Sequence, residues 1–219
     1  RFDVFPWHFA GPAIAGDDTV PRGIAVNADG RKMFIFGDVD NDVTEYTLDT
    51  GFDISDNLTA VSGPGDISSQ TTSPLGMAFN TDGTKMFIVG KIGKDVNDYA
   101  CSTGFDVSTC TFTDNFSVDT QEDAPSGIAF NTDGTKMFVL GANGDDVNEY
   151  ACSTGFDVST CSGVKDKDIS SQEVNALAMA FNSDGTKMFI AGFAGDDVNE
   201  YTLSTGYDVS TATFVDAFS

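Results

Sequence analysis

One short sequence motif occurs four times in the chain at nearly constant spacing. The turn sequence Asn-x-Asp-Gly begins at Asn27, Asn80, Asn131 and Asn182, so successive copies lie 53, 51 and 51 residues apart. A fixed period of this length indicates an array of equivalent supersecondary units, because each unit is too small to bury its apolar face without a neighbour. The repeat therefore constrains the architecture strongly. It says little about chemistry, since a catalytic site needs residues that differ from one another.

The third repeat shows which elements one unit contains. Two apolar runs, 127–131 and 136–141, flank the Asn-x-Asp-Gly turn, and the second run is apolar on both alternating faces. Such a strand is buried on both sides, as in a sheet that lies between other layers. A third strand over 146–152 is more polar, which suggests a place further from the centre. The fourth strand is clearest at 111–117 in the second repeat.

Four short antiparallel strands in about 50 residues match one blade of a β-propeller. No segment has the period of an amphipathic helix, which argues against a helical solenoid. We therefore predict an all-β fold, a β-propeller of four-stranded antiparallel blades, as a single array over 1–219. Residues 1–17 are expected to form an N-terminal outer strand and linker. The four repeats cover approximately 18–70, 71–121, 122–172 and 173–219.

One outer strand is surplus to a ring of four blades. The phrase Phe2-Asp3-Val4 matches 105–107, which precedes a fourth strand, and Ser219 matches Ser117, which ends one. Three interpretations follow. The ring closes with one terminal strand and leaves the other at its periphery, the array continues into further blades, or the surplus strand pairs with another molecule at an exposed sheet edge. We favour the second and third.

Four cysteines occur as two pairs with the same spacing. Cys101 and Cys110 form one pair, and Cys152 and Cys161 form the other. The other two repeats have no cysteine at either position, so the two positions change together, as the two halves of a disulfide must. A zinc site fits less well, because eight intervening residues exceed the usual ligand spacing and His8 is the only histidine. We therefore predict two disulfides.

Disulfides persist outside the reducing cytosol. The predicted location is therefore extracellular, periplasmic, or on the surface of a cell or virion. Two sequons, which begin at Asn57 and Asn115, permit N-glycosylation where the source has that machinery.

The chain is strongly acidic. Eleven basic against 34 acidic residues give a formal net charge of −23. Such a surface repels nucleic-acid phosphates and anionic lipids, and no stretch reaches the roughly 18 apolar residues that span a bilayer. We therefore predict neither a nucleic-acid partner nor membrane insertion. Because acidic residues are spread over every repeat, a solvated acidic exterior is a better interpretation than a binding surface for one basic partner.

One turn in the first repeat is a candidate metal site. Asp38, Asp40 and Asp42 place carboxylates at alternate positions of a glycine-flanked turn. Hard cations take several oxygen ligands, so this turn suggests Ca2+, the one cofactor that the sequence indicates. Asp145-Asp146 and Asp196-Asp197 occupy the equivalent turn in later repeats, whereas the second repeat has a lysine there. The alternative is aspartate as a turn former and as protection of an exposed sheet edge.

The sequence offers no catalytic set. No Ser-His-Asp or Cys-His combination can be assembled, because His8 is the only histidine and the cysteines are committed to bridges. We therefore predict that the chain is not an enzyme. A lysine recurs after each turn glycine, and we expect it to pair with a nearby aspartate. These lysines are Lys32, Lys85, Lys136 and Lys187.

The run 125–139, Pro-Ser-Gly-Ile-Ala-Phe-Asn-Thr-Asp-Gly-Thr-Lys-Met-Phe-Val, resembles the YVTN and lactonase-like β-propeller repeats. The typical sequence pattern of these repeats is a Pro-x-Gly, an apolar strand, an Asn/Ser-x-Asp-Gly turn followed by a basic residue, and a second apolar strand. The resemblance covers nearly the whole chain and extends to repeats in proteins of marine bacteria and their phages. It implies a surface-layer, adhesive or scaffold module, or, through the lactonase-like members, a hydrolase. The family's usual ring has more than four blades.

The leading hypothesis is a non-enzymatic extracellular β-propeller module with a structural, assembly or adhesion role. Its expected partners are other copies of itself or further propeller repeats. The first alternative is a carbohydrate- or receptor-binding module that recognises a glycan or a surface receptor. The second alternative is a lactonase-like hydrolase.

Overall fold

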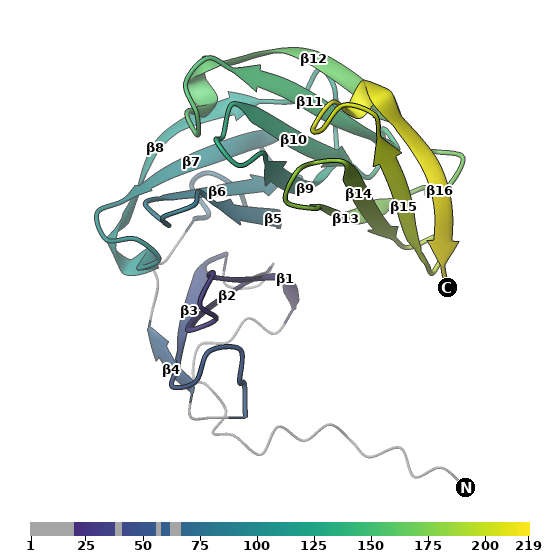
Figure 1. Cartoon of the computed structure of the whole chain (residues 1–219). Helices are drawn as coiled ribbons and strands as arrows, with labels where there is room; N and C mark the ends of the chain where they lie inside the picture. The colour runs from purple at the N-terminus through teal and green to yellow at the C-terminus, as the bar shows by residue number, and fades with distance from the viewer. Residues whose placement is uncertain (1–19, 38–40, 56–57, 62–66) are drawn as a thin grey trace, which may run out of the picture.

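The computed structural model describes residues 20–37, 41–55, 58–61 and 67–219. They form four antiparallel sheets of four strands each, and within every sheet the strands follow chain order from one edge to the other (Figure 1). Blade 1 contains β1 (Pro21–Val26), β2 (Lys32–Gly37), β3 (Val43–Leu48) and β4 (Leu58–Val61). Blade 2 contains β5 (Pro74–Phe79), β6 (Lys85–Gly90), β7 (Asp95–Cys101) and β8 (Cys110–Ser117).

The last two blades repeat this pattern. Blade 3 contains β9 (Pro125–Phe130), β10 (Lys136–Gly141), β11 (Asp146–Cys152) and β12 (Cys161–Asp168). Blade 4 contains β13 (Ala176–Phe181), β14 (Lys187–Gly192), β15 (Val198–Leu203) and β16 (Ala212–Phe218). The fold prediction is therefore confirmed: the protein is an all-β propeller with four blades of four antiparallel strands. The N-terminal strand predicted within 1–17 lies outside the described residues.

The helical elements of the described residues are three short 3-10 turns, each just before an outer strand. They are η1 (Val107–Thr109), η2 (Val158–Thr160) and η3 (Val209–Thr211). The aspartate before the turn caps it in blades 2 and 4, where its carboxylate accepts a hydrogen bond from the N–H of the second turn residue. The first residue of each turn is a valine whose side chain is fully buried.

The repeated Asn-x-Asp-Gly turn joins the first two strands of a blade. In blade 3, Asn131 accepts a hydrogen bond through Oδ1 from the backbone N–H of Lys136. Gly134 has a φ of 72°, and a Cβ there would lie 2.3 Å from the Phe156 ring. Glycine is therefore required both by the backbone and by packing. Phe156 covers this turn.

In blades 2 and 3, the second strand is buried on both faces, as predicted. Met137, Phe138, Val139 and Leu140 on β10 are all completely inaccessible to solvent. The third strand lies further from the centre than the first two strands of its blade, as expected. Its polar residues Asn148 and Glu149 are nevertheless buried, along with most of its apolar residues. Glu149 contacts the next blade, whereas Asn148 donates a hydrogen bond to Asp146 of its own strand.

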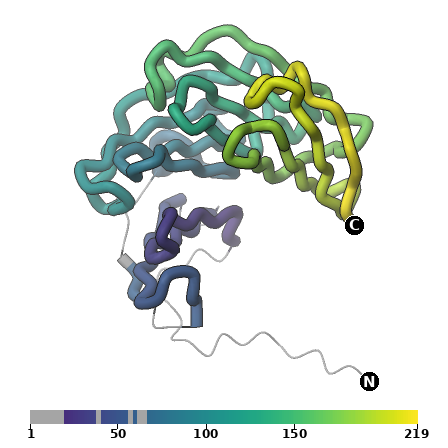
Figure 2. Tube along the Cα trace, in the orientation of Figure 1, coloured from purple at the N-terminus to yellow at the C-terminus, as the bar shows by residue number. Residues whose placement is uncertain are grey.

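The blades stack side by side along an arc (Figures 1 and 2). The first strands contact one another in chain order, β1 with β5, β5 with β9 and β9 with β13. Glycines allow this close approach, since a Cβ on Gly76 would lie 2.9 Å from the Cα of Gly127. The described parts of blades 1 and 4 lie apart in both views. The core consists mainly of apolar clusters between neighbouring blades.

Both predicted disulfides are present, Cys101–Cys110 in blade 2 and Cys152–Cys161 in blade 3. Each one joins the end of the third strand to the start of the fourth. Blade 4 has Leu203 and Ala212 as the corresponding strand pair, and both are buried. In blade 4 an apolar pair therefore takes the place of the cysteines.

Candidate interaction site between blades

Each blade contains one ion pair between the repeated lysine of its second strand and an acidic residue of its third strand. In blade 3, Lys136 Nζ lies 2.7 Å from Glu149 Oε1. The register of the two strands causes this pairing, because the two residues sit on neighbouring strands near the same end of the sheet. The four pairs are Lys32–Glu45, Lys85–Asp98, Lys136–Glu149 and Lys187–Glu200.

The expectation that these lysines pair with aspartate is right only for Lys85. In the other three blades the partner is a glutamate. The lysine and its acid are 13 residues apart in the chain. Only the pairing of the second and third strands identifies this acid among the many acidic residues nearby.

The second carboxylate oxygen of two of these glutamates reaches the next blade. Glu149 Oε2 accepts a hydrogen bond of 2.9 Å from the backbone N–H of Val209, the first residue of η3. Glu45 Oε2 accepts one of 3.0 Å from Val107, the first residue of η1. Both glutamates are buried. We call this arrangement, with lysine on one oxygen and the turn of the next blade on the other, the acid bridge.

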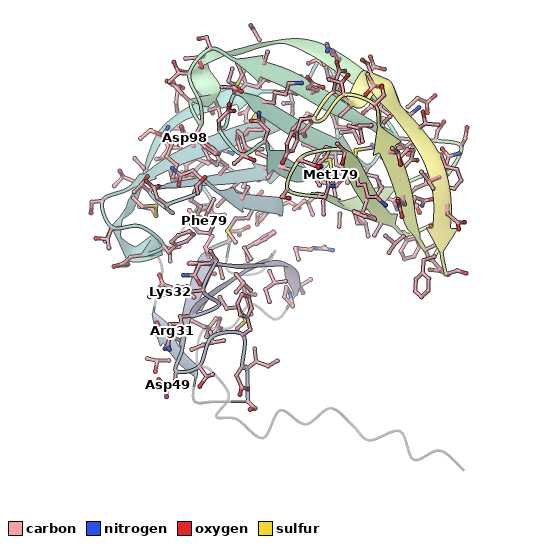
Figure 3. All side chains as sticks on the ribbon, in the orientation of Figure 1. Arg31, Lys32, Asp49, Phe79, Asp98 and Met179 are labelled. Carbon is pink, nitrogen blue, oxygen red and sulfur yellow. A yellow bond between two sulfur atoms is a disulfide. The ribbon has the colours of Figure 1, made fainter. Side chains whose placement is uncertain are left out.

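Asp98 occupies the same position in blade 2 but is one methylene group shorter. Its Oδ2 lies 2.6 Å from Lys85 Nζ. Within the described part of the chain, its buried Oδ1 has no hydrogen-bond partner. Burial raises the pKa of Asp98, an effect that Lys85 partly opposes. Figure 3 labels Asp98 in blade 2, and the corresponding turn of blade 3 begins at Val158.

An aromatic trio lies at each of the three interfaces between neighbouring blades. Between blades 3 and 4, the Phe138 ring lies 4.6 Å from Phe181 and 6.1 Å from Tyr207, measured between ring centroids. Figure 3 labels Phe79, which takes the place of Phe181 at the first interface. The other two trios are Phe34–Phe79–Phe105 and Phe87–Phe130–Phe156. Each interface thus combines an aromatic cluster, in which one ring is fully buried, with a buried acid.

The same surface is uncovered at the end of the arc. A cavity of about 200 Å3 opens on blade 4, lined by Phe189, Val198, Glu200, Asp216, Ala217 and Phe218. We call this surface the tail face. The repeat spacing of 51 residues makes Phe189, Val198 and Glu200 the equivalents of residues that blade 4 covers on blade 3.

The candidate calcium turn lies mostly outside the described residues, which include Asp42 but not Asp38 or Asp40. In later repeats the aspartates act as turn formers. Asp145 has a φ of 51° and accepts a hydrogen bond of 3.0 Å from the backbone N–H of Asn175. Among the described residues, no group of three or more His, Cys, Asp or Glu is arranged to hold a metal ion. The calcium site in the first repeat stays a prediction.

Asp146, next to this turn, is held in a partly buried position. Its Oδ1 accepts a hydrogen bond of 2.7 Å from Asn148 Nδ2. Burial, together with the nearby charge of Glu122, raises the pKa of Asp146 to about 6. Glu122 in turn accepts hydrogen bonds from the N–H groups of Ala124 and Gly144. These carboxylates therefore organise the turns at one edge of blade 3.

One of the two sequons can be placed in the structure. Asn115 is exposed on β8, and its Nδ2 donates a hydrogen bond of 2.9 Å to Asp95 Oδ2. Asn57 lies outside the described residues. Glycosylation at either asparagine stays a prediction.

No family model matches the chain, and no curated protein matches it. Solved structures do match. A protein of unknown function from Desulfotomaculum acetoxidans is 19% identical with a TM-score of 0.57, over 92% of this chain and 58% of that one. A suspected 6-phosphogluconolactonase of Bacteroides fragilis is 15% identical with a TM-score of 0.58, over 94% of this chain and 56% of that one.

A suspected 6-phosphogluconolactonase of Bacteroides uniformis is also similar, at 13% identity and a TM-score of 0.58, over 90% of this chain and 56% of that one. At such identities the likeness shows the fold alone, which resembles that of lactonase-like propellers. This chain spans a little more than half the length of these structures. Membership of the YVTN family stays a prediction. The described residues include no helix of the length and apolarity needed to cross a membrane.

Proposed function

We propose that this chain is a non-enzymatic, structural β-propeller module of an exterior surface, which acts by assembly and by rigid presentation of its loops. The observation that carries the proposal is the acid bridge. The buried carboxylates Glu45 and Glu149 join one blade to the next within the chain, so they stabilise the array of blades. A rigid array of this kind holds loops at fixed spacing, as a scaffold or adhesive module requires.

The two disulfides support a location outside the cytosol, because the glutathione pool would keep these cysteines reduced inside it. The extracellular, cell-surface or virion assignment is part of the proposal. It predicts that the protein purified from its native source without reductant has no thiol that reacts with a thiol reagent until it is unfolded and reduced. Four reactive cysteines in that material would contradict the assignment.

A lactonase-like hydrolase is the alternative that the names of similar structures suggest. The net charge of −23 disfavours a phosphorylated lactone, because the field of the protein repels an anionic substrate. We expect the purified chain to hydrolyse 6-phosphogluconolactone, neutral lactones and simple esters no faster than buffer does. A genuine lactonase assayed in parallel shows that the method works. Turnover that is proportional to the concentration of this chain would contradict the proposal.

The other alternative is a module that binds a glycan or a surface receptor. The account predicts no saturable binding to a glycan array beyond that of a protein of equal negative charge. A defined glycan that binds and raises the melting temperature would favour this alternative, since a ligand that binds only the folded state stabilises it. We likewise expect no binding to nucleic acid.

A further inference from the structure

The tail face on blade 4 is half of an interface that is complete elsewhere in the molecule. Val198 is 40% exposed, whereas the equivalent Val147 of blade 3 is completely buried under blade 4. Phe189 and Glu200 are partly exposed, although their equivalents on blade 3 are buried. Glu200 Oε1 pairs with Lys187 as in the acid bridge. Its Oε2 is in the position from which Glu149 reaches the next blade.

The opposite half lies on blade 1. Ile24 and Val26 on β1 and Phe52 and Ile54 in the loop after β3 are exposed, and we call them the head face. Phe52 matches Phe105, Phe156 and Tyr207 of the aromatic trios. Ile54 matches the valine that begins each 3-10 turn. It is 54% exposed, whereas those valines are completely buried.

We propose that the tail face of one molecule binds the head face of a second copy of this chain. This inference rests on the proposed assembly function and names its partner. In the contact, the Ile54 N–H of the second copy donates a hydrogen bond to Glu200 Oε2. Phe52 and Val26 pack against Phe189, in the places that Tyr207 and Phe181 take against Phe138 between blades 3 and 4. The geometry repeats that of the interface between blades 3 and 4.

Complementarity between the two faces identifies a second copy as the occupant. The tail face offers two aromatic rings and two carboxylates, and the head face offers an aromatic ring, aliphatic side chains and the backbone N–H of Ile54. A symmetric tail-to-tail contact would bring two Glu200 carboxylates together, which like-charge repulsion disfavours. Within one molecule the two faces lie at separate ends of the arc (Figure 2). The contact is therefore intermolecular and head to tail.

Sedimentation equilibrium of the whole chain tests the proposal with charged substitutions. Val198→Asp places a charge in the tail face, and Ile54→Asp places a charge in the head face, so each should prevent the apolar contact. Val164→Asp and Ile92→Asp are matched controls, because these residues are exposed to a similar degree, 45% and 55%, and lie in neither face. Unchanged circular dichroism and melting temperature confirm that each variant folds. We expect the wild type and both controls to associate and the two face variants to remain monomeric.

Mixing the two face variants tests the head-to-tail geometry directly. Val198→Asp keeps its head face and Ile54→Asp keeps its tail face, so the mixture is expected to form a one-to-one dimer that neither variant forms alone. Glu200→Gln in the wild type is expected to weaken association about tenfold, because the hydrogen bond from Ile54 loses its charged acceptor. A monomeric wild type, an association that both face variants retain, or a mixture that stays monomeric would overturn the proposal.

These failures differ from a failure of the proposed function. A monomeric wild type that hydrolyses no lactone overturns only the head-to-tail contact. Lactone turnover overturns the proposed function, whatever the state of association.

Discussion

The interface between blades 2 and 3 and the interface between blades 3 and 4 differ by one methylene group near their centre. Glu149 contacts both Lys136 of its own blade and Val209 of the next. Asp98 reaches its lysine but leaves Oδ1 buried without a hydrogen-bond partner in the described part of the chain. The aromatic trios are nearly the same, with closest centroid distances of 4.5 and 4.6 Å. Apolar packing therefore holds the blades together, and side-chain length decides whether the acid also joins them.

The largest expected effect comes from removing a complete acid bridge. Glu149→Ala should lower the free energy of unfolding by about 3 kcal/mol, because the buried Val209 N–H loses its acceptor and Lys136 loses its ion pair. Urea unfolding measures the loss. Glu200→Ala, the same change on the uncovered tail face, should cost the monomer about 0.5 kcal/mol or less. Equal losses in the two variants would show that the bridge to the next blade contributes nothing.

Removal of one disulfide is expected to have the next largest effect. The double variant Cys152→Ala and Cys161→Ala should lose about 2–3 kcal/mol, because the unfolded chain regains the freedom of a loop of about ten residues. The variant Cys152→Leu and Cys161→Ala copies the pair found in blade 4 and should recover about 1 kcal/mol through apolar burial. Thermal unfolding without reductant compares the three proteins. A leucine variant that is less stable than the alanine variant would contradict the equivalence of the two blades.

The pH dependence of stability tests the effect of burial on the charge of the Asp146 carboxylate. The pKa of Asp146 is raised to about 6 in the folded state from an ordinary value of 3.8. The stabilising contribution of protonated Asp146 to the free energy of unfolding is therefore fully present below about pH 4. It is lost as the pH rises through about 6, because the native state must then hold a charged carboxylate in a partly buried position. After allowance for solvent screening, the loss is about 1–2 kcal/mol.

Asp146→Asn removes this titration while the side chain can still accept the hydrogen bond from Asn148. The stability of the variant relative to the wild type should rise between pH 4 and pH 7. Guanidinium unfolding at both pH values measures the change. A stability difference that is constant over this range would contradict the raised pKa.

The smallest expected effect comes from lengthening Asp98. Asp98→Glu should stabilise the protein by about 1 kcal/mol, because the added methylene group lets the carboxylate reach the N–H of Val158, as Glu149 reaches Val209. The reverse change, Glu149→Asp, should destabilise it by a similar amount. Urea unfolding of both variants checks whether the signs are opposite. Two changes of the same sign would mean that local packing, and not reach, decides the outcome.

The sequence predicts what lies within one repeat better than what lies between repeats. Spacing and apolar runs were sufficient for the blades, and the joint replacement of cysteines was sufficient for both disulfides. The acid bridge was missed because Glu149 and Val209 are 60 residues apart and meet only when two blades stack. A signal was present, since an acid precedes the tyrosine of the third strand in all four repeats. Its partner is a backbone N–H, a group that every residue except proline has, so the sequence alone does not identify it.

Amide hydrogen exchange at the turn residues Ile54, Val107, Val158 and Val209 tests the central claim most directly. The account predicts slow exchange at Val107 and Val209, whose N–H groups bind glutamate, and faster exchange at Val158, which faces the shorter Asp98. Ile54 should exchange fast in dilute protein and more slowly as the protein concentration rises and a second copy covers it. Equal exchange at the three valines, together with an Ile54 rate that is independent of concentration, would contradict the account.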